Sequence, residues 1–184
     1  MFLNTTHFFS KNSFLKSFCE KVVSIGDQKQ LQSAKITTGN QNNRKSNIAW
    51  IEDKEIVTEI TKVINQASTK SNWNFLLREF EPLQYTVYNK DDYYDWHIDS
   101  RSKPHDNGLI RKLSFSICLN NDFEGGEFEL GFPHPNSEKN AIVKMTMSRG
   151  DILVFPSHTW HKVNKVISGV RKSLVGWVVG KPFV

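Results

Sequence analysis

Apolar residues recur at helical spacing in two segments of the first third of the chain. Between Ser13 and Gly26 they return every three to four positions, and Gly26 is expected to end the helix because glycine often follows the last helical residue. From Asp53 to Ala67 they fall on one side of a helix whose first turn Asp53 is placed to cap. We therefore predict two amphipathic helices that cover one sheet. A polar loop over 39–47 and a short strand over 48–51 are expected between them.

From Gln84 onward the pattern changes to short runs rich in strand-forming residues, with turn residues such as Gly125-Gly126 between several of them. These runs predict a mainly β protein, in which N-terminal helices pack on one sheet of a jelly-roll-like double sheet. We expect a single domain over 1–184, with a helical support region at 1–80 and a β core at 84–179. The eight predicted strands cover 84–89, 94–99, 111–119, 126–130, 141–147, 151–155, 160–166 and 170–179.

The composition is typical of one folded domain, with 184 residues, 12% aromatic and 23% charged. No run approaches the roughly 18 apolar residues of a membrane-spanning helix, and polar residues interrupt the Phe-rich start. We therefore expect no membrane span and no signal peptide. Cys19 and Cys118 lie far apart outside any CxxC pattern, which fits a reducing, cytoplasmic setting. The net charge of +5 is spread along the chain, so a nucleic-acid partner is not favoured.

His97 and Asp99 stand two residues apart in an aromatic-rich predicted strand. Residues at this spacing share one face of a strand. An imidazole and a carboxylate on one face form part of a metal site that needs one more ligand from elsewhere. The pair alone is weak evidence, because two polar residues at a strand end are common.

A second candidate ligand, His161, lies further along the chain and is followed ten residues later by Arg171. Two histidines and one carboxylate form the facial triad of non-haem iron(II) oxygenases, which leaves metal positions open for a bidentate ligand and O₂. 2-Oxoglutarate is such a ligand through its C1 carboxylate and C2 ketone. Its C5 carboxylate then requires an anchor, and the donor fork of Arg171 suits it. Ser173, on the same strand face as Arg171, could donate a hydroxyl to that carboxylate.

His158 competes with His161 for the third ligand position. The two residues are three apart, so on a strand they face opposite sides, and we favour His161 with His158 at the rim. The other histidines, His7, His105 and His134, are interpreted as surface residues.

These residues belong to a longer ordered series. The series is Tyr88, Tyr94, His97-Ile98-Asp99, Arg111 to Ser114, Glu124 to Glu127, Gly150-Asp151, Phe155-Pro156, His161 and Arg171. It resembles the 2-oxoglutarate- and Fe(II)-dependent dioxygenase superfamily, in its prolyl 4-hydroxylase-like branch, well over 84–179 and loosely in the N-terminal third. Arg171 stands where collagen-type prolyl hydroxylases have Lys, and no endoplasmic-reticulum signal is seen, so small stand-alone bacterial or viral relatives are favoured.

The resemblance implies a double-stranded β-helix with Fe(II), 2-oxoglutarate and O₂, and ascorbate as a reductant. It also implies hydroxylation of a substrate, by default a prolyl residue in a peptide or protein, with release of succinate and CO₂. Tyr88 is expected to touch 2-oxoglutarate or close its pocket, although a core role fits equally. Trp177 is expected to line the interior near the metal, again with core packing as the alternative.

Several points stay open at this stage. The polar segment from Asp99 to Arg111, which contains Arg101, Lys103 and His105, is a candidate substrate-facing lid. Gly125 and Gly126 are assigned to a tight turn without chemistry. The alternatives are a nucleic-acid or small-molecule oxygenase of the same superfamily and a non-catalytic metal-binding or sugar-binding barrel. A nucleic-acid demethylase would carry a second arginine where Trp177 stands. The oligomeric state is not predicted.

Overall fold

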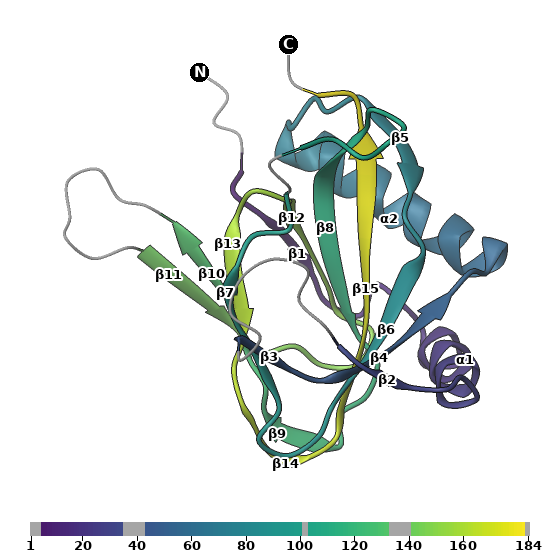
Figure 1. Ribbon diagram of the computed structural model, residues 1–184, viewed down its shortest axis with the longest axis vertical. Helices are drawn as coiled ribbons and strands as arrows, with labels where there is room; N and C mark the ends of the chain where they lie inside the picture. The colour runs from purple at the N-terminus through teal and green to yellow at the C-terminus, as the bar shows by residue number, and fades with distance from the viewer. Residues whose placement is uncertain (1–4, 35–42, 101–102, 133–140, 183–184) are drawn as a thin grey trace.

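The computed structural model describes residues 5–34, 43–100, 103–132 and 141–182, and its main feature is a pair of facing antiparallel sheets (Figure 1). The larger sheet follows the order β1-β12-β8-β15-β6-β4-β2, with β5 also paired to β15. Its strands are β1 Phe8–Ser10, β12 Ile152–Pro156, β8 Ile110–Cys118, β15 Arg171–Gly180, β6 Leu83–Tyr88, β4 Asn47–Ile51, β2 Gln32–Ser33 and β5 Leu77–Phe80.

The smaller sheet follows the order β11-β10-β13-β7-β3, and a separate two-stranded sheet joins β14 to β9. This arrangement confirms the predicted mainly β jelly roll with helices on one sheet. The strands are β11 Ala141–Met145, β10 Phe128–Phe132, β13 Trp160–Val163, β7 Tyr93–His97, β3 Arg44–Lys45, β14 Val166–Gly169 and β9 Phe123–Gly125.

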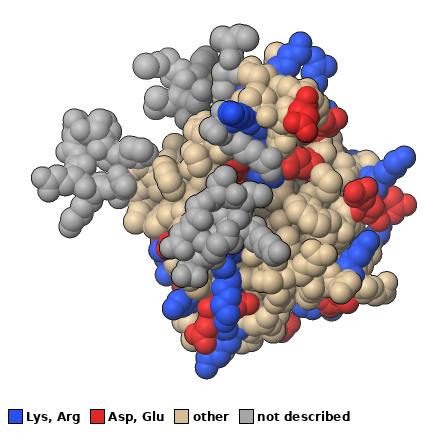
Figure 2. Space-filling model, in the orientation of Figure 1, with Lys and Arg blue, Asp and Glu red and all other residues tan. Residues whose placement is uncertain are grey.

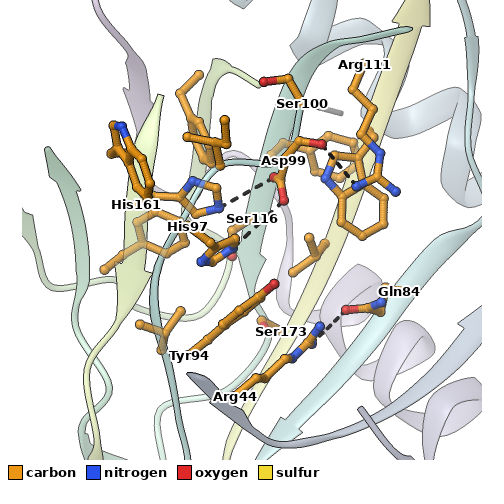
Figure 3. Close-up of a pocket in the computed structure, with 18 of the residues that line it drawn as sticks. Arg44, Gln84, Tyr94, His97, Asp99, Ser100, Arg111, Ser116, His161 and Ser173 are labelled. Atoms are coloured by element: carbon orange, nitrogen blue, oxygen red, sulfur yellow. Dashed lines mark hydrogen bonds and ion pairs between the residues drawn. The ribbon is translucent and has the colours of Figure 1, made fainter. Parts of the chain in front are cut away.

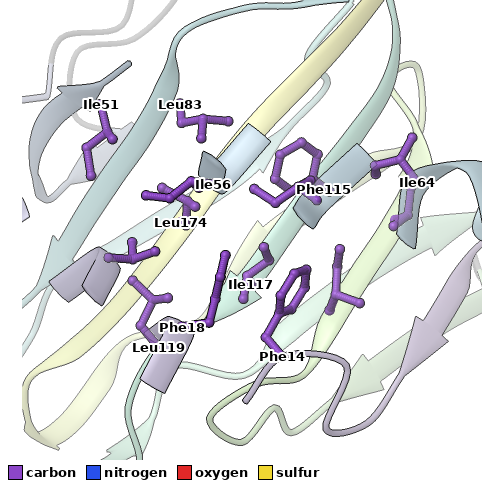
Figure 4. Close-up of a cluster of buried hydrophobic side chains, with 14 of the residues drawn as sticks. Phe14, Phe18, Ile51, Ile56, Ile64, Leu83, Phe115, Ile117, Leu119 and Leu174 are labelled. Atoms are coloured by element: carbon purple, nitrogen blue, oxygen red, sulfur yellow. The ribbon is translucent and has the colours of Figure 1, made fainter. Parts of the chain in front are cut away.

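Both predicted helices are present, as α1 Lys16–Asp27 and α2 Lys54–Ser71, and they pack on the outer face of the larger sheet (Figures 1 and 4). The carboxylate of Asp53 accepts the backbone N–H groups of Glu55 and Ile56 at 2.9 and 3.0 Å, which confirms the predicted cap. Gly26 does not end α1 as predicted. It lies inside the last turn, where a Cβ atom would stand 2.4 Å from the Tyr85 ring, so close packing explains the glycine.

Side chains alternate along the central strands between a helix-facing core and the space between the sheets. On β15, Leu174 and Val178 belong to the helix-facing cluster, and Figure 4 shows Leu174 with two other members of it, Ile56 and Phe115. Arg171, Ser173 and Trp177 point the other way and line a pocket between the sheets. Because side chains alternate along the strand, Arg171 and Ser173 both face the pocket and lie together at the start of β15.

The predicted strands differ from the structure mainly at their ends. The strand predicted over 94–99 ends at His97, so Asp99 lies just beyond it, and the one predicted over 126–130 runs from Phe128 to Phe132. The pattern missed β1, β2, β3, β5, β9 and β14, which are two to four residues long. Among the described residues, no helix combines the length and apolar character that a membrane span requires.

Candidate metal and cosubstrate site

A cavity of about 830 Å³ opens between the two sheets (Figure 3). Strands β7 and β13 of the smaller sheet pair antiparallel with His97 opposite His161, which places the two imidazoles side by side. Asp99 follows β7, and its backbone N–H donates to the carbonyl oxygen of Ser157 at 2.9 Å. That bond ties the end of β7 to the turn that precedes β13, and so brings the carboxylate back over both rings.

One ligand atom each from His97, Asp99 and His161 lies within 4.8 Å of the others. The carboxylate oxygens of Asp99 are 3.8 Å from His97 Nε2 and 3.5 Å from His161 Nε2 (Figure 3). These separations are too long for direct hydrogen bonds and leave space between the atoms. The arrangement can therefore hold a metal ion with two nitrogen ligands and one oxygen ligand.

The outer nitrogens of the two rings decide which tautomer each histidine adopts. His97 Nδ1 lies 2.7 Å from the carbonyl oxygen of Asp95, and His161 Nδ1 lies 2.9 Å from that of Thr159. A carbonyl oxygen only accepts, so each Nδ1 must carry a proton, and in the neutral form of the ring Nε2 then presents a lone pair. Two lone pairs and a carboxylate facing one point repel one another unless a cation sits between them, which fits a divalent metal ion.

Burial and neighbouring charges set the protonation of the cluster. Burial, with a smaller effect of His161, lowers the pKa of His97 to about 3. For Asp99 burial acts to raise the pKa, but His161, His97 and Arg111 outweigh it and hold the pKa below its ordinary value. Near neutral pH His97 is uncharged and Asp99 ionised, the forms in which these side chains bind metals.

Arg171 lies across the same pocket on β15 and is almost fully buried, with 1% of its surface exposed. Its Nη1 donates to Ser173 Oγ at 3.2 Å, while Nε and Nη2 are buried without an acceptor in the part of the chain that the structure describes. The rings of Tyr88 and Phe123 lie 5.6 and 5.9 Å from its guanidinium carbon. A buried cation with unsatisfied donors is costly unless an anion arrives, and a carboxylate matches its fork.

The turn glycine Gly126 has a role that the sequence pattern did not reveal. Its φ of +62° is a left-handed conformation, and a Cβ atom there would lie 2.7 Å from Arg171 Cδ. The absence of a side chain therefore leaves room for the arginine. Two further pocket residues, Arg44 and Gln84, were also not predicted. Arg44 lies in the loosely matched N-terminal third, and Gln84 begins a predicted strand but was given no role in the site.

Two other arginines line the pocket. The Nε and Nη2 atoms of Arg111 donate to the two carboxylate oxygens of Glu81 at 2.7 and 2.6 Å, and its guanidinium lies 3.8 Å from the Trp177 ring centre. Trp177 Nε1 is buried and has no acceptor among the described residues. Arg44 donates to Ser46 and Gln84, both at 2.8 Å.

The structure brings most of the sequence-predicted site residues to one pocket. His158 is exposed and does not line it. His105, interpreted as a surface residue, is instead half-buried with Nε2 3.3 Å from Glu81, and His7 is half-buried with its ring 6.4 Å from Phe132. His134 and Arg101 lie outside the described residues. The residues that line the pocket as expected are Tyr88, His97, Asp99, His161, Arg171, Ser173 and Trp177.

Comparison with known families agrees with this geometry. The model of the 2OG-Fe(II) oxygenase superfamily matches residues 83–179, which contain His97, Asp99, His161 and Arg171. The chain therefore belongs to the 2OG-Fe(II) oxygenase superfamily, a family of 2-oxoglutarate-dependent dioxygenases. A PKHD-type hydroxylase of Prochlorococcus marinus is 31% identical over 166 residues, which cover 85% of this chain and 70% of that protein.

A second PKHD-type hydroxylase, from Idiomarina loihiensis, is 34% identical over 93 residues, 50% of this chain but only 38% of that protein's length. Among solved structures, a viral collagen prolyl hydroxylase from Paramecium Bursaria Chlorella virus-1 has a TM-score of 0.71 at 18% identity. That match covers 96% of this chain and 97% of the viral one. A Pseudomonas putida prolyl-4-hydroxylase has a TM-score of 0.72 at 18% identity, covering 96% and 94%. These structural likenesses confirm the predicted jelly-roll fold.

Proposed function

We propose that the protein is an oxidoreductase that hydroxylates its substrate with Fe(II), 2-oxoglutarate and O₂. His97, Asp99 and His161 would hold the metal, and Arg171 with Ser173 would hold the distal carboxylate of 2-oxoglutarate. The observation that carries the proposal is the buried guanidinium of Arg171, which has two donors without a partner among the described residues and lines the same cavity as His97, Asp99 and His161. A metal-binding module without a cosubstrate would gain nothing from this buried charge.

Bound there, Fe(II) supplies the oxidising chemistry, with succinate and CO₂ as the products of the cosubstrate and ascorbate as a reductant. The chain's own residues hold and shield that centre. Phe128 and Phe155 lie 5.6 and 4.7 Å from the His161 ring, and Tyr94 stacks on His97 at 3.5 Å. These rings fix both imidazoles and keep water from the back of the site. Tyr88, next to Arg171, would close the cosubstrate end.

A prolyl residue in a peptide or protein is the substrate that we propose. Support comes from Trp177, a pocket residue whose Nε1–H has no acceptor among the described residues and is available to donate to a backbone carbonyl oxygen. Three further tryptophans, Trp50, Trp96 and Trp160, line the pocket, where apolar rings suit a pyrrolidine. The two solved structures named above are of prolyl hydroxylases, which agrees with a prolyl substrate.

The segment that follows Asp99 is proposed to face this substrate, because Ser100, Lys103 and Pro104 line the pocket. A nucleic-acid substrate is less favoured, since basic and acidic side chains are intermingled on the face in Figure 2. Trp177 occupies the position at which a nucleic-acid demethylase would carry its second arginine, and it stacks on Arg111.

Iron-dependent release of succinate from 2-oxoglutarate tests the proposal directly. We expect release by the wild type that depends on added Fe(II), and its loss in His97→Ala, Asp99→Ala and His161→Ala, each verified as folded. His158→Ala is the matched control, because this exposed histidine lies outside the pocket and should keep activity. No iron-dependent succinate from the wild type, or an inactive His158→Ala beside an active His161→Ala, would contradict the proposal.

A further inference from the structure

Three arginines line the pocket, and only one of them has a carboxylate partner among the described residues. Arg111 is neutralised by the bidentate contact with Glu81. Arg171 has unpartnered buried donors that the distal carboxylate of 2-oxoglutarate would occupy. Arg44 remains, a half-buried guanidinium for which neither the described residues nor the cosubstrate provides an anion.

The contacts of Arg44 hold it in one position without neutralising it. Its Nε donates to Ser46 Oγ and its Nη2 to Gln84 Oε1, each at 2.8 Å, and its guanidinium carbon lies 4.5 Å from the Tyr94 ring centre. All three partners are uncharged. Hydrogen bonds and an aromatic face orient the guanidinium, while its full charge stays available to a ligand.

Arg44 also lies close to the reacting centre. The ring of Tyr94 stacks on His97 with 3.5 Å between centroids, and Figure 3 shows Tyr94 between that imidazole and Arg44. One aromatic ring therefore separates the cation from a proposed metal ligand. A group bound by Arg44 would belong to the substrate at or next to the oxidised position.

The balance of charge in the loaded pocket points the same way. A divalent metal would be balanced by Asp99 and one carboxylate of 2-oxoglutarate, and Arg171 would be balanced by the other carboxylate. Of the remaining lining cations, Lys103 is exposed, where water solvates it, so Arg44 is the partly buried charge left over. A partly buried guanidinium contributes most to binding when it forms charge-assisted hydrogen bonds with an anionic group of the ligand.

We propose that Arg44 is a carboxylate-binding subsite, and that the substrate carries an acidic side chain beside the residue that is hydroxylated. This inference rests on the proposed function. The competing interpretation is that Arg44 only ties β3 to β6 and β7, in which case a negative charge on the ligand brings no advantage.

Binding of two blocked tripeptides separates these interpretations, because acetyl-Asp-Pro-Asp-amide and acetyl-Asn-Pro-Asn-amide differ only in charge. Affinity is measured by calorimetry with protein saturated with Mn(II) and 2-oxoglutarate, so that Arg171 is occupied and no turnover occurs. We expect the acidic peptide to bind about ten-fold or more tightly than the neutral one in the wild type. The preference should largely vanish in Arg44→Gln and persist in part in Arg44→Lys.

Lys45→Gln is the matched control, since it removes the same charge from the same strand. Lys45 is exposed, pairs with Asp92 at 3.1 Å and does not line the pocket, so the preference should survive. Equal affinity of the wild type for the two peptides overturns the proposal without any variant. The absence of binding of either peptide at millimolar concentration overturns it as well. A preference that survives in Arg44→Gln also overturns it. Iron-dependent succinate release without peptide tests the proposed function separately.

Discussion

At the scale of single residues, Arg171 is a buried cation whose proposed partner is the distal carboxylate of 2-oxoglutarate. A charge-assisted bidentate contact is worth about 1.5–3 kcal/mol, so Arg171→Ala should weaken 2-oxoglutarate binding about ten- to a hundred-fold. Arg171→Lys should restore part of the affinity, because the charge remains while the fork is lost. Calorimetric titration of 2-oxoglutarate into Mn(II)-loaded protein measures both variants. Unchanged affinity in Arg171→Ala, with metal binding intact, would leave only a metal site.

A neighbouring glycine should tune the same affinity. In Gly126→Ala the new methyl group would lie 2.7 Å from Arg171 Cδ, which forces the arginine to move and should weaken 2-oxoglutarate binding several-fold. Gly108→Ala is the control, because Gly108 has a comparable φ of +75° but nothing within 4 Å of an added Cβ. If backbone strain were the only effect, both variants would lose stability equally and keep their affinity for 2-oxoglutarate. That result would contradict a role of Gly126 in placing Arg171.

The candidate site could be predicted where its residues lie close together in the sequence. His97 and Asp99 are two residues apart, which is the spacing that places two side chains on one face of a strand. Arg171 follows His161 by ten residues, which is the spacing that the family resemblance implies. Arg44 and Gln84 could not be assigned in this way. They meet across 40 positions in sequence, only because β3 reaches β7 and β4 reaches β6. Nothing local in either strand signals that contact.

At the scale of elements, the start of α2 depends on a single side chain. Asp53 caps the backbone N–H groups of Glu55 and Ile56, and Asp53→Ala should lower the free energy of unfolding by about 0.5–2 kcal/mol. Urea denaturation measures the change, and Glu52→Ala on the preceding exposed residue is the control. Equal stability of Asp53→Ala and the wild type would show that packing alone sets the start of this helix.

Long, strongly patterned elements were predictable, whereas short ones were not. The helices and the central strands β8 and β15 carry enough alternating or periodic positions to indicate type and face. The two-residue strands β2 and β3 have no period to detect, and they exist because β4 and β7 offer them a free edge. The predicted strand at 94–99 ended early because Asp99 N–H binds Ser157 rather than a ladder partner.

At the scale of the whole molecule, the proposed ligands would join the two sheets. His97 and His161 come from the smaller sheet, and Arg171 comes from the larger one. A metal alone would therefore tie together only β7, β13 and the loop that carries Asp99. 2-Oxoglutarate on that metal would reach Arg171 and span the space between the sheets.

Thermal unfolding should report the binding of the metal and the binding of 2-oxoglutarate separately. A ligand at a hundred times its Kd adds about 2.7 kcal/mol of stability, which for a chain of this length corresponds to roughly 5–10 °C in Tm. We expect Mn(II) to raise the Tm of the wild type, and 2-oxoglutarate to raise it further only when Mn(II) is present. Arg171→Ala should keep the metal increment and lose the second one, while His161→Ala should lose both. A 2-oxoglutarate increment that survives without metal, or in Arg171→Ala, would mean that the cosubstrate binds elsewhere on the protein.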